Sequence, residues 1–194
     1  VGAGRGFYSR PEIQDMIHLV HAFSDARDQL ARVAVLRGPV FSLSDAVMVV
    51  LFGQGDHGRR WRDWLEHGDD CEFLTILDDE DRAALSDAQV VWSRLAAQAG
   101  RISPVEWLRL ALEISGAWAA YAAGRRGEQA LANVRLFLDR VRDMVHEQGP
   151  NLRSLAERLQ SELERDDADK DAEADVSAGT GVTITTMHKA KGLE

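Results

Sequence analysis

Apolar residues recur every three or four positions along most of this chain. The longest stripe ends at Gly149-Pro150 and comprises Leu131, Val134, Leu138, Val141 and Val145. Because an α-helix has about 3.6 residues per turn, this spacing places these side chains on one face and predicts an amphipathic helix. A similar stripe near the start consists of Ile13, Met16, Ile17 and Val20. The pattern therefore predicts a mainly α-helical body.

Helix-start signals divide this body into about seven to nine helices. Residues 9–12 (Ser-Arg-Pro-Glu) and 103–106 (Ser-Pro-Val-Glu) both have the form of a capping box with a proline at the helix start. Asp25, Ser44 and Asn151 are the expected caps of three further helices. The five tryptophans fall mostly on apolar helical faces, which favours packing in the core over stacking on nucleic-acid bases.

Both ends of the chain lack the helical spacing of apolar residues that the body shows. Residues 165–181 are acidic, lack apolar periodicity and predict a flexible linker. The following "GVTITTMH" alternates β-branched residues and predicts a strand, and "VGAGRGFY" at the start predicts a second short one. Two isolated strands are marginal outside a sheet. We therefore expect the helical body to be an insertion within an α/β domain.

The composition bears on the partners, the metal sites and the cellular location of the protein. The net charge is −9 over 194 residues, but much of it lies in one acidic run at 164–175, so it is only weak evidence against a nucleic-acid partner. The single cysteine, Cys71, excludes an internal disulfide and a Cys-x-x-Cys zinc site. The histidines show no metal-ligand spacing, and we assign no metal ligand. Without an apolar run long enough for a membrane span, and without a leader, the expected location is the cytoplasm.

The last residues, "VTITTMHKAKGLE", carry the most specific combination of side chains. A strand would deliver Thr186 and His188 to its carboxyl end, where open α/β sheets bind ligands. A hydroxyl and an imidazole can donate hydrogen bonds to phosphates, and Lys189 and Lys191 add positive charge. The Glu194 carboxylate can accept hydrogen bonds from ribose hydroxyls. The alternative is that these side chains form an ordinary exposed strand end.

This tail resembles motif V of the superfamily 1 DNA helicases of the UvrD/Rep and RecB/AddA type. That motif is a strand followed by Thr-x-His-x-x-Lys-Gly-Leu-Glu, and residues 186–194 supply it in order and spacing. In the family, the threonine and histidine contact single-stranded DNA and the glutamate contacts the nucleotide. The resemblance therefore implies DNA binding by Thr186, His188, Lys189 and Lys191, and nucleotide binding by Glu194.

Three further segments resemble the same family. "GFYSRPEIQDMIHLV" resembles the segment that opens its inserted helical subdomain, with Phe7, Arg10, Glu12, Ile13 and Asp15 matching. "VAVLRGPVFSLSD" (33–45) and "ALANVRLFLDRV" (130–141) resemble segments of the RecB/AddA branch. Residues 53–128 align only loosely. Each of these segments could also have a purely structural role. Arg10 and Glu12 could form a charge pair at the helix start, and residues 36–45 could form a turn without a ligand. The basic segments "GRRW" (58–61) and "GRRG" (124–127) could be solvated loops instead of contacts to duplex phosphates.

The resemblance implies four parts. Residues 1–8 would be a strand end of a RecA-like α/β motor domain (2A), 9–164 a helical 2B-like subdomain, 165–181 an acidic linker, and 182–194 the motif V strand and loop of 2A. The chain would then be a fragment of an ATP-dependent DNA helicase, or helicase–nuclease, of repair or recombination.

Its parent would use ATP and Mg²⁺, and would bind single-stranded DNA and single/double-strand junctions, with a second helicase–nuclease subunit as a further candidate partner. This chain contains no phosphate-binding Gly-x-x-x-x-Gly-Lys-[Ser/Thr] loop, no acidic strand end for magnesium and no catalytic residue of its own, so alone it is expected to be inactive. Two rivals remain: a helical protein–protein interaction module without motor activity, and a stand-alone all-α DNA-binding protein.

Overall fold

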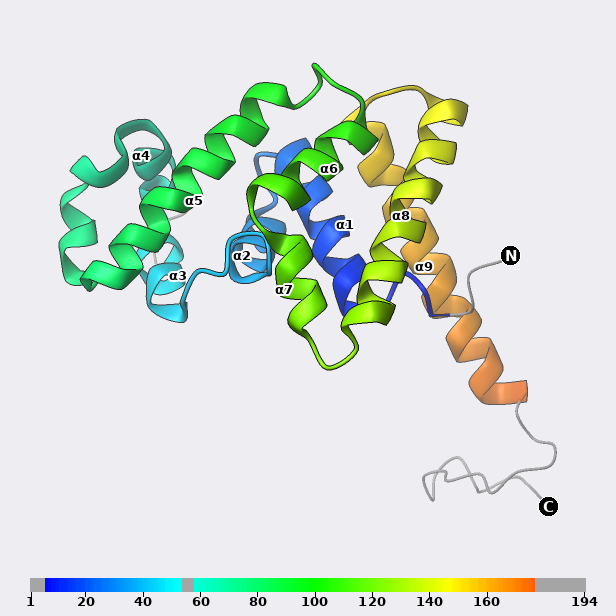
Figure 1. Ribbon diagram of the computed structural model, residues 1–194. Helices are drawn as coiled ribbons and strands as arrows, with labels where there is room; N and C mark the ends of the chain where they lie inside the picture. Colours follow the sequence, from blue (N-terminus) through cyan, green and yellow to red (C-terminus); the bar gives the residue numbers. More distant parts are fainter. Residues whose placement is uncertain (1–5, 54–57, 177–194) are drawn as a thin grey trace, which may run out of the picture.

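The computed structural model describes residues 6–53 and 58–176, and these form a mainly α-helical protein, as the periodicity predicts (Figure 1). Nine α-helices and two short 3₁₀-helices occur in the described residues. They are α1 (Pro11–Ser24), α2 (Gln29–Arg37), α3 (Asp45–Phe52), α4 (Arg59–His67), η1 (Gly68–Asp70), η2 (Glu72–Ile76), α5 (Asp79–Gln98), α6 (Pro104–Ile114), α7 (Ala117–Ala123), α8 (Gly127–Gln148) and α9 (Leu152–Val176).

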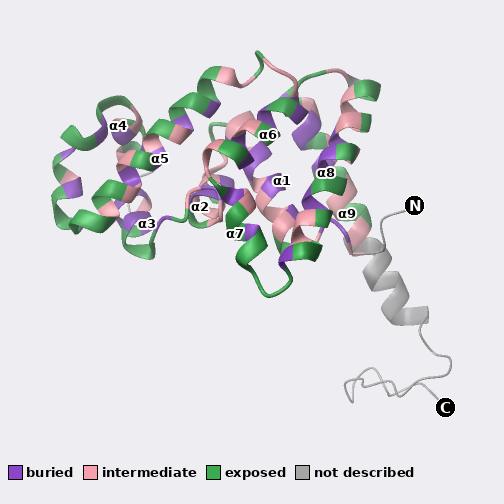
Figure 2. Ribbon diagram, in the orientation of Figure 1, coloured by how far each residue is buried: buried purple, intermediate pink, exposed green. Residues whose placement is uncertain are grey.

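Helix α1 is the centre of one end of the molecule, where it packs against α2, α8 and α9. Its apolar residues Ile13, Met16 and Leu19 are fully buried, and so is Val20. Burial of each such side chain stabilises the fold by about 1.5–3 kcal/mol. Helix α6 packs against α8 and α7, which closes this end around α1. Figure 2 shows the buried residues on the faces that these helices turn toward one another.

An aromatic cluster fills the other end, between α3, α4 and α5. The Trp61 and Trp92 rings meet edge to face with centroids 4.7 Å apart, and Phe23 of α1 stacks on Trp92 at 4.1 Å. The buried Trp107 ring donates a hydrogen bond from Nε1 to the Leu95 carbonyl at 2.9 Å. Four of the five tryptophans are buried and Trp118 is half-buried, so the prediction of core packing is confirmed.

Several predicted helix starts are confirmed. Ser103 and Glu106 form a complete capping box at α6. The Ser44 hydroxyl accepts a hydrogen bond from the Val47 amide at the start of α3. Helix α8 carries the long apolar stripe and ends at Gln148, with Gly149 as its C-terminal cap. At each of these helix ends, the capping residue and the apolar spacing predict the same helix boundary.

Two predicted caps are wrong. Asp28, not Asp25, caps α2 by accepting a hydrogen bond from the Ala31 amide at 2.8 Å. Asp25 instead lies at the end of α1 and accepts from the Arg27 amide, which forms the turn between the two helices. Helix α1 begins at Pro11 as expected, but its cap residue is Arg10 and no side chain caps it.

The predicted ends of the chain also need correction. Helix α9 continues to Val176, so a linker does not begin at residue 165. Ion pairs of Glu162 with Arg158 and Arg165 stabilise this polar helix, which apolar periodicity cannot detect. Residues 6–10 form turns and bends rather than a strand. Residues 1–5, 177–181 and the predicted strand at 182–194 lie outside the described residues.

Candidate functional site

All five tail residues predicted to bind DNA or nucleotide lie outside the described residues: Thr186, His188, Lys189, Lys191 and Glu194. Within the described part of the chain, the structure instead brings together two of the other resembling segments, 7–15 and 130–141. They meet where α1 begins beside α8, and α9 passes the same point (Figure 1). This junction is the candidate site that can be built from side-chain geometry.

A carboxylate of α9 holds the turn that precedes α1. The Asp166 side chain accepts hydrogen bonds from the Gly6 amide at 2.8 Å and the Tyr8 amide at 2.9 Å, one on each oxygen. The Ser9 hydroxyl lies 3.5 Å from the second oxygen. We call this set of contacts the Asp166 clamp. It joins positions about 160 residues apart and brings the two ends of the helical body side by side.

An arginine of α8 packs on the same turn. The Arg140 guanidinium lies over the Phe7 ring at 4.4 Å from its centroid and over the Tyr8 ring at 5.3 Å. Both rings are buried, and burial raises the pKa of the Tyr8 hydroxyl, an effect that Arg140 partly offsets. The cation therefore rests on two ring faces, an arrangement worth about 0.5–2 kcal/mol.

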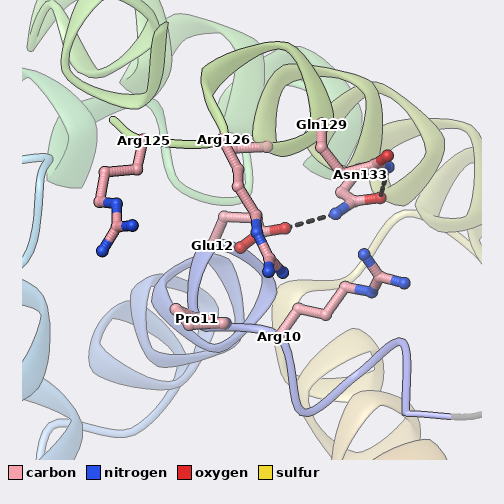
Figure 3. Close-up of a pocket in the computed structure, with 8 residues that line it drawn as sticks. Arg10, Pro11, Glu12, Arg125, Arg126, Gln129 and Asn133 are labelled. Atoms are coloured by element: carbon pink, nitrogen blue, oxygen red, sulfur yellow. Dashed lines mark hydrogen bonds between the residues drawn. The ribbon is translucent and has the colours of Figure 1, made fainter. Parts of the chain in front are cut away.

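Glu12 and Asn133 connect α1 to α8. The Asn133 amide donates a hydrogen bond to the Glu12 carboxylate, and Gln129 donates to the Asn133 amide oxygen at 2.9 Å (Figure 3). Asn133 is the one buried polar side chain within the described residues, with 5% of its surface exposed. The partner of Glu12 is thus Asn133, and the alternative of an Arg10–Glu12 charge pair is not what the structure contains.

One turn further along α1, Asp15 bonds to α7. The Tyr121 hydroxyl donates to the Asp15 carboxylate at 3.0 Å. Burial raises the pKa of Asp15 above its ordinary value of 3.8, and the bond from Tyr121 offsets part of that effect. The pKa of Tyr121 is also raised, mainly by burial and then by the neighbouring Asp15 charge. Asp15 and Tyr121 therefore tie α1 to α7, as Glu12 and Asn133 tie it to α8.

A polar pocket of about 570 Å³ opens beside the Glu12–Asn133 bond. Arg10 comes from the turn before α1, and Arg125 and Arg126 come from the loop between α7 and α8 (Figure 3). Within the described part of the chain, no carboxylate lies within ion-pair distance of these three guanidinium groups. The pocket therefore has an excess of positive charge.

The other basic segment, "GRRW", is occupied by contacts within the protein. Arg59 pairs with Asp63 at 3.7 Å. Arg60 donates a hydrogen bond to the Val50 carbonyl at 3.1 Å and lies over the Phe73 ring. The two basic segments look alike in sequence, but Arg59 and Arg60 make contacts within the protein, whereas Arg125 and Arg126 line the pocket beside Glu12.

The segment 36–45 forms the turn between α2 and α3. The Leu43 amide bonds to the Leu36 carbonyl at 2.9 Å, and Arg37 pairs with Asp45 at 2.7 Å. Ser42 has a left-handed backbone with φ of 53°, which fits a tight turn. The reading of this segment as a structural turn is therefore favoured.

The described residues offer no grouping of three or more His, Cys, Asp or Glu that could hold a metal ion. His21 is half-buried, and burial lowers its pKa, while Asp28 at 4.0 Å opposes that shift. No helix in the described ranges is both long and apolar enough to cross a membrane.

Sequence reasoning identified Arg10, Glu12, Arg125 and Arg126 but missed the residues that hold them in place. Asp166 lies in an acidic run whose local pattern gives no sign of a specific role. Tyr121 lies on a helix that the sequence did not clearly predict. The pairing of Tyr121 with Asp15 crosses 106 residues and has no local signal.

Comparison with known protein families gives one match. The family of UvrD-like helicase C-terminal domains matches residues 1–194, which is the whole chain. No curated protein matches this chain.

Proposed function

Because the chain belongs to the family of UvrD-like helicase C-terminal domains, we propose that it forms part of an ATP-dependent DNA helicase that unwinds duplex DNA in repair or recombination. The observation that carries this proposal is the family match over all 194 residues. The sequence of the tail agrees with it, because residues 186–194 supply the whole motif V pattern.

The helical body is proposed to be the 2B-like subdomain, inserted into motor domain 2A. The Asp166 clamp supports this reading, because an inserted body must leave its host domain and return to it at neighbouring points. The segments at 33–45 and 130–141 favour the RecB/AddA branch over the UvrD/Rep branch. A nuclease domain in the same protein and a second helicase–nuclease subunit belong to that proposal.

In this proposal, Thr186 and His188 donate hydrogen bonds to phosphates of single-stranded DNA, assisted by the charges of Lys189 and Lys191. Glu194 accepts hydrogen bonds from the nucleotide. In the complete enzyme, hydrolysis of ATP would supply the free energy of unwinding, and Mg²⁺ would neutralise charge on the ATP phosphates. The role that we propose for the helical body is to guide DNA.

The test is strand separation of a forked duplex by the full-length protein, with and without ATP. Thr186→Ala and His188→Ala should each weaken unwinding at limiting DNA by roughly tenfold, since a hydrogen bond to a charged group contributes about 1.5–3 kcal/mol. Thr185→Ala is the matched control, because alternation along the predicted strand places it on the opposite face. If all three variants unwind like the parent, the proposed roles of the tail residues are wrong.

The same assay separates the motor from a helical interaction module. A full-length protein that neither hydrolyses ATP with DNA nor separates strands, but forms a stable complex with a protein partner, would overturn the helicase proposal. The isolated 194-residue chain should show no ATP hydrolysis, because it lacks the phosphate-binding loop.

A further inference from the structure

The pocket between α1 and the α7–α8 loop has the charge of an anion site. It contains three guanidinium groups, from Arg10, Arg125 and Arg126, against one carboxylate, from Glu12. The chain as a whole has a net charge of −9, so this local excess of positive charge is not a consequence of general basicity. Three like charges around one opening repel one another, and a bound anion would relieve that repulsion.

The two walls of the pocket are held in a fixed relation. The Glu12–Asn133 hydrogen bond ties the start of α1 to α8, which carries the second wall. Gly127 brings the start of α8 directly onto α7, because a Cβ at this position would lie 2.0 Å from the Ala122 carbonyl oxygen. The Gly127 amide also bonds to the Gly124 carbonyl at 3.0 Å. The loop that carries Arg125 and Arg126 is thus closed at its base.

The arginines are spread across the pocket rather than directed at one point. In Figure 3 the Arg125 and Arg10 side chains lie at opposite sides of the view, with Arg126 and Glu12 between them. Such a spread suits a ligand with several anionic groups in a row. The cap residue of α8, Arg126, makes no side-chain capping bond, so the start of this 22-residue helix adds further positive potential beside the arginines.

Arginine favours phosphate among such ligands, because its planar guanidinium presents paired N–H donors that match phosphate oxygens. Lysine is absent from the lining, and the charged side chains besides Glu12 are all arginine. A second, shallower hollow of about 450 Å³ adjoins the pocket and shares Arg125 and Arg126 with it. Its lining also includes Glu128 and Ala132. The arginine surface therefore extends beyond what a single phosphate ion would occupy.

We infer that Arg10, Arg125 and Arg126 form a site for successive backbone phosphates of DNA, with Glu12 and Asn133 holding its two walls together. The inference rests on the proposed helicase function, and it assigns that function a contact surface on the helical body, separate from the predicted tail residues. Because the contacts are to phosphates, the site positions DNA without reading its sequence.

The test uses the full-length protein and the binding of a labelled duplex and a labelled single strand, measured by fluorescence anisotropy over a range of salt concentrations. Each lost phosphate contact lowers the slope of log affinity against log salt by about 0.9 for duplex DNA. At about 0.1 M salt this is worth roughly 8-fold per contact. The double variant Arg125→Ala/Arg126→Ala should therefore bind duplex up to roughly 60-fold more weakly, with a slope lower by about 1.8.

Three further variants make the test specific. Arg94→Ala/Arg101→Ala removes the same charge from exposed arginines on α5 and the turn after it, and should leave affinity and slope unchanged. Arg125→Lys/Arg126→Lys keeps the charge and should lose only part of the affinity. Glu12→Gln keeps an acceptor for Asn133 but removes the negative charge from the pocket, so it should bind DNA more tightly.

Equal binding by Arg125→Ala/Arg126→Ala and the parent would overturn the inference. An equal loss in the Arg94→Ala/Arg101→Ala control would overturn it too, because the effect would then be general electrostatics. If Arg125→Ala/Arg126→Ala lost affinity for the single strand but not for the duplex, the arginines would bind single-stranded DNA. That result would contradict the loss of duplex binding expected here. A full-length protein that fails to unwind any substrate is a distinct result, because it refutes the proposed helicase function first.

Discussion

Replacing Asp166 with alanine tests the contact that closes the helical body. Its carboxylate accepts hydrogen bonds from the Gly6 and Tyr8 amides at 2.8 and 2.9 Å. Hydrogen bonds to charged groups contribute about 1.5–3 kcal/mol each, and the site is only partly buried, which favours the lower end of that range. For two bonds, Asp166→Ala should therefore lower the free energy of unfolding by about 3 kcal/mol.

The assay is thermal and urea unfolding of the 194-residue chain, followed by tryptophan fluorescence. For a domain of this size, each kcal/mol shifts Tm by about 2–4 °C, so a fall of roughly 6–12 °C is expected. Asp166→Asn should be intermediate, because one amide oxygen cannot replace two carboxylate oxygens. Glu164→Ala removes the same charge from an exposed position of α9 and serves as the control. Should Asp166→Ala unfold together with this control, the clamp does not stabilise the fold.

Other contacts give sharper stability tests. Trp107→Ala should destabilise by about 3–5 kcal/mol, and Trp107→Phe by less, because both remove the hydrogen bond from the indole to the Leu95 carbonyl but the alanine change also leaves a cavity. Gly127→Ala should destabilise and weaken duplex binding together, since its Cβ would collide with the Ala122 carbonyl. Asp15→Asn should match the parent at pH below 3.8 and become the more stable protein as pH rises, because the raised folded-state pKa makes the charged Asp15 costly only above that pH.

Each of these expectations has a clear contrary result. A Trp107→Phe variant as unstable as the alanine variant would show that the indole N–H, not the ring volume, carries the stabilisation. Wild-type stability in Gly127→Ala would show that α8 can move away from α7 without cost. A pH-independent difference between Asp15→Asn and the parent, measured by urea unfolding from pH 3 to 8, would contradict the burial argument.

The helical class and several helix boundaries could be predicted from sequence because their causes are local. The stripe from Leu131 to Val145 and the capping box at Ser103 act within a few residues, and the structure reproduces both. Asp25 and Asp28 are both good caps, and only the turn geometry between α1 and α2 decides for Asp28. The end of α9 was missed for a related reason, since a polar helix leaves no apolar period to detect.

The candidate site could be predicted only in part. The composition of "GRRG" and "GRRW" marks both as basic, but the contacts of Arg60 with Val50 and Phe73 exist only after folding. The same holds for the bond between Glu12 and Asn133, which lie 121 positions apart. Contacts of this kind have no local signal, so the sequence alone could not tell the two basic segments apart.

The Asp166 clamp also affects the path by which tension passes through the helical body. Because the turn at Gly6–Tyr8 and the α9 carboxylate are joined directly, tension applied between Gly6 and Asp166 loads these hydrogen bonds before it reaches the helices between these two residues. The path of the load is then a few ångströms long, while more than 150 residues lie outside it. If the proposed insertion into a motor domain is right, these two hydrogen bonds would let that domain carry the helical body without stretching it.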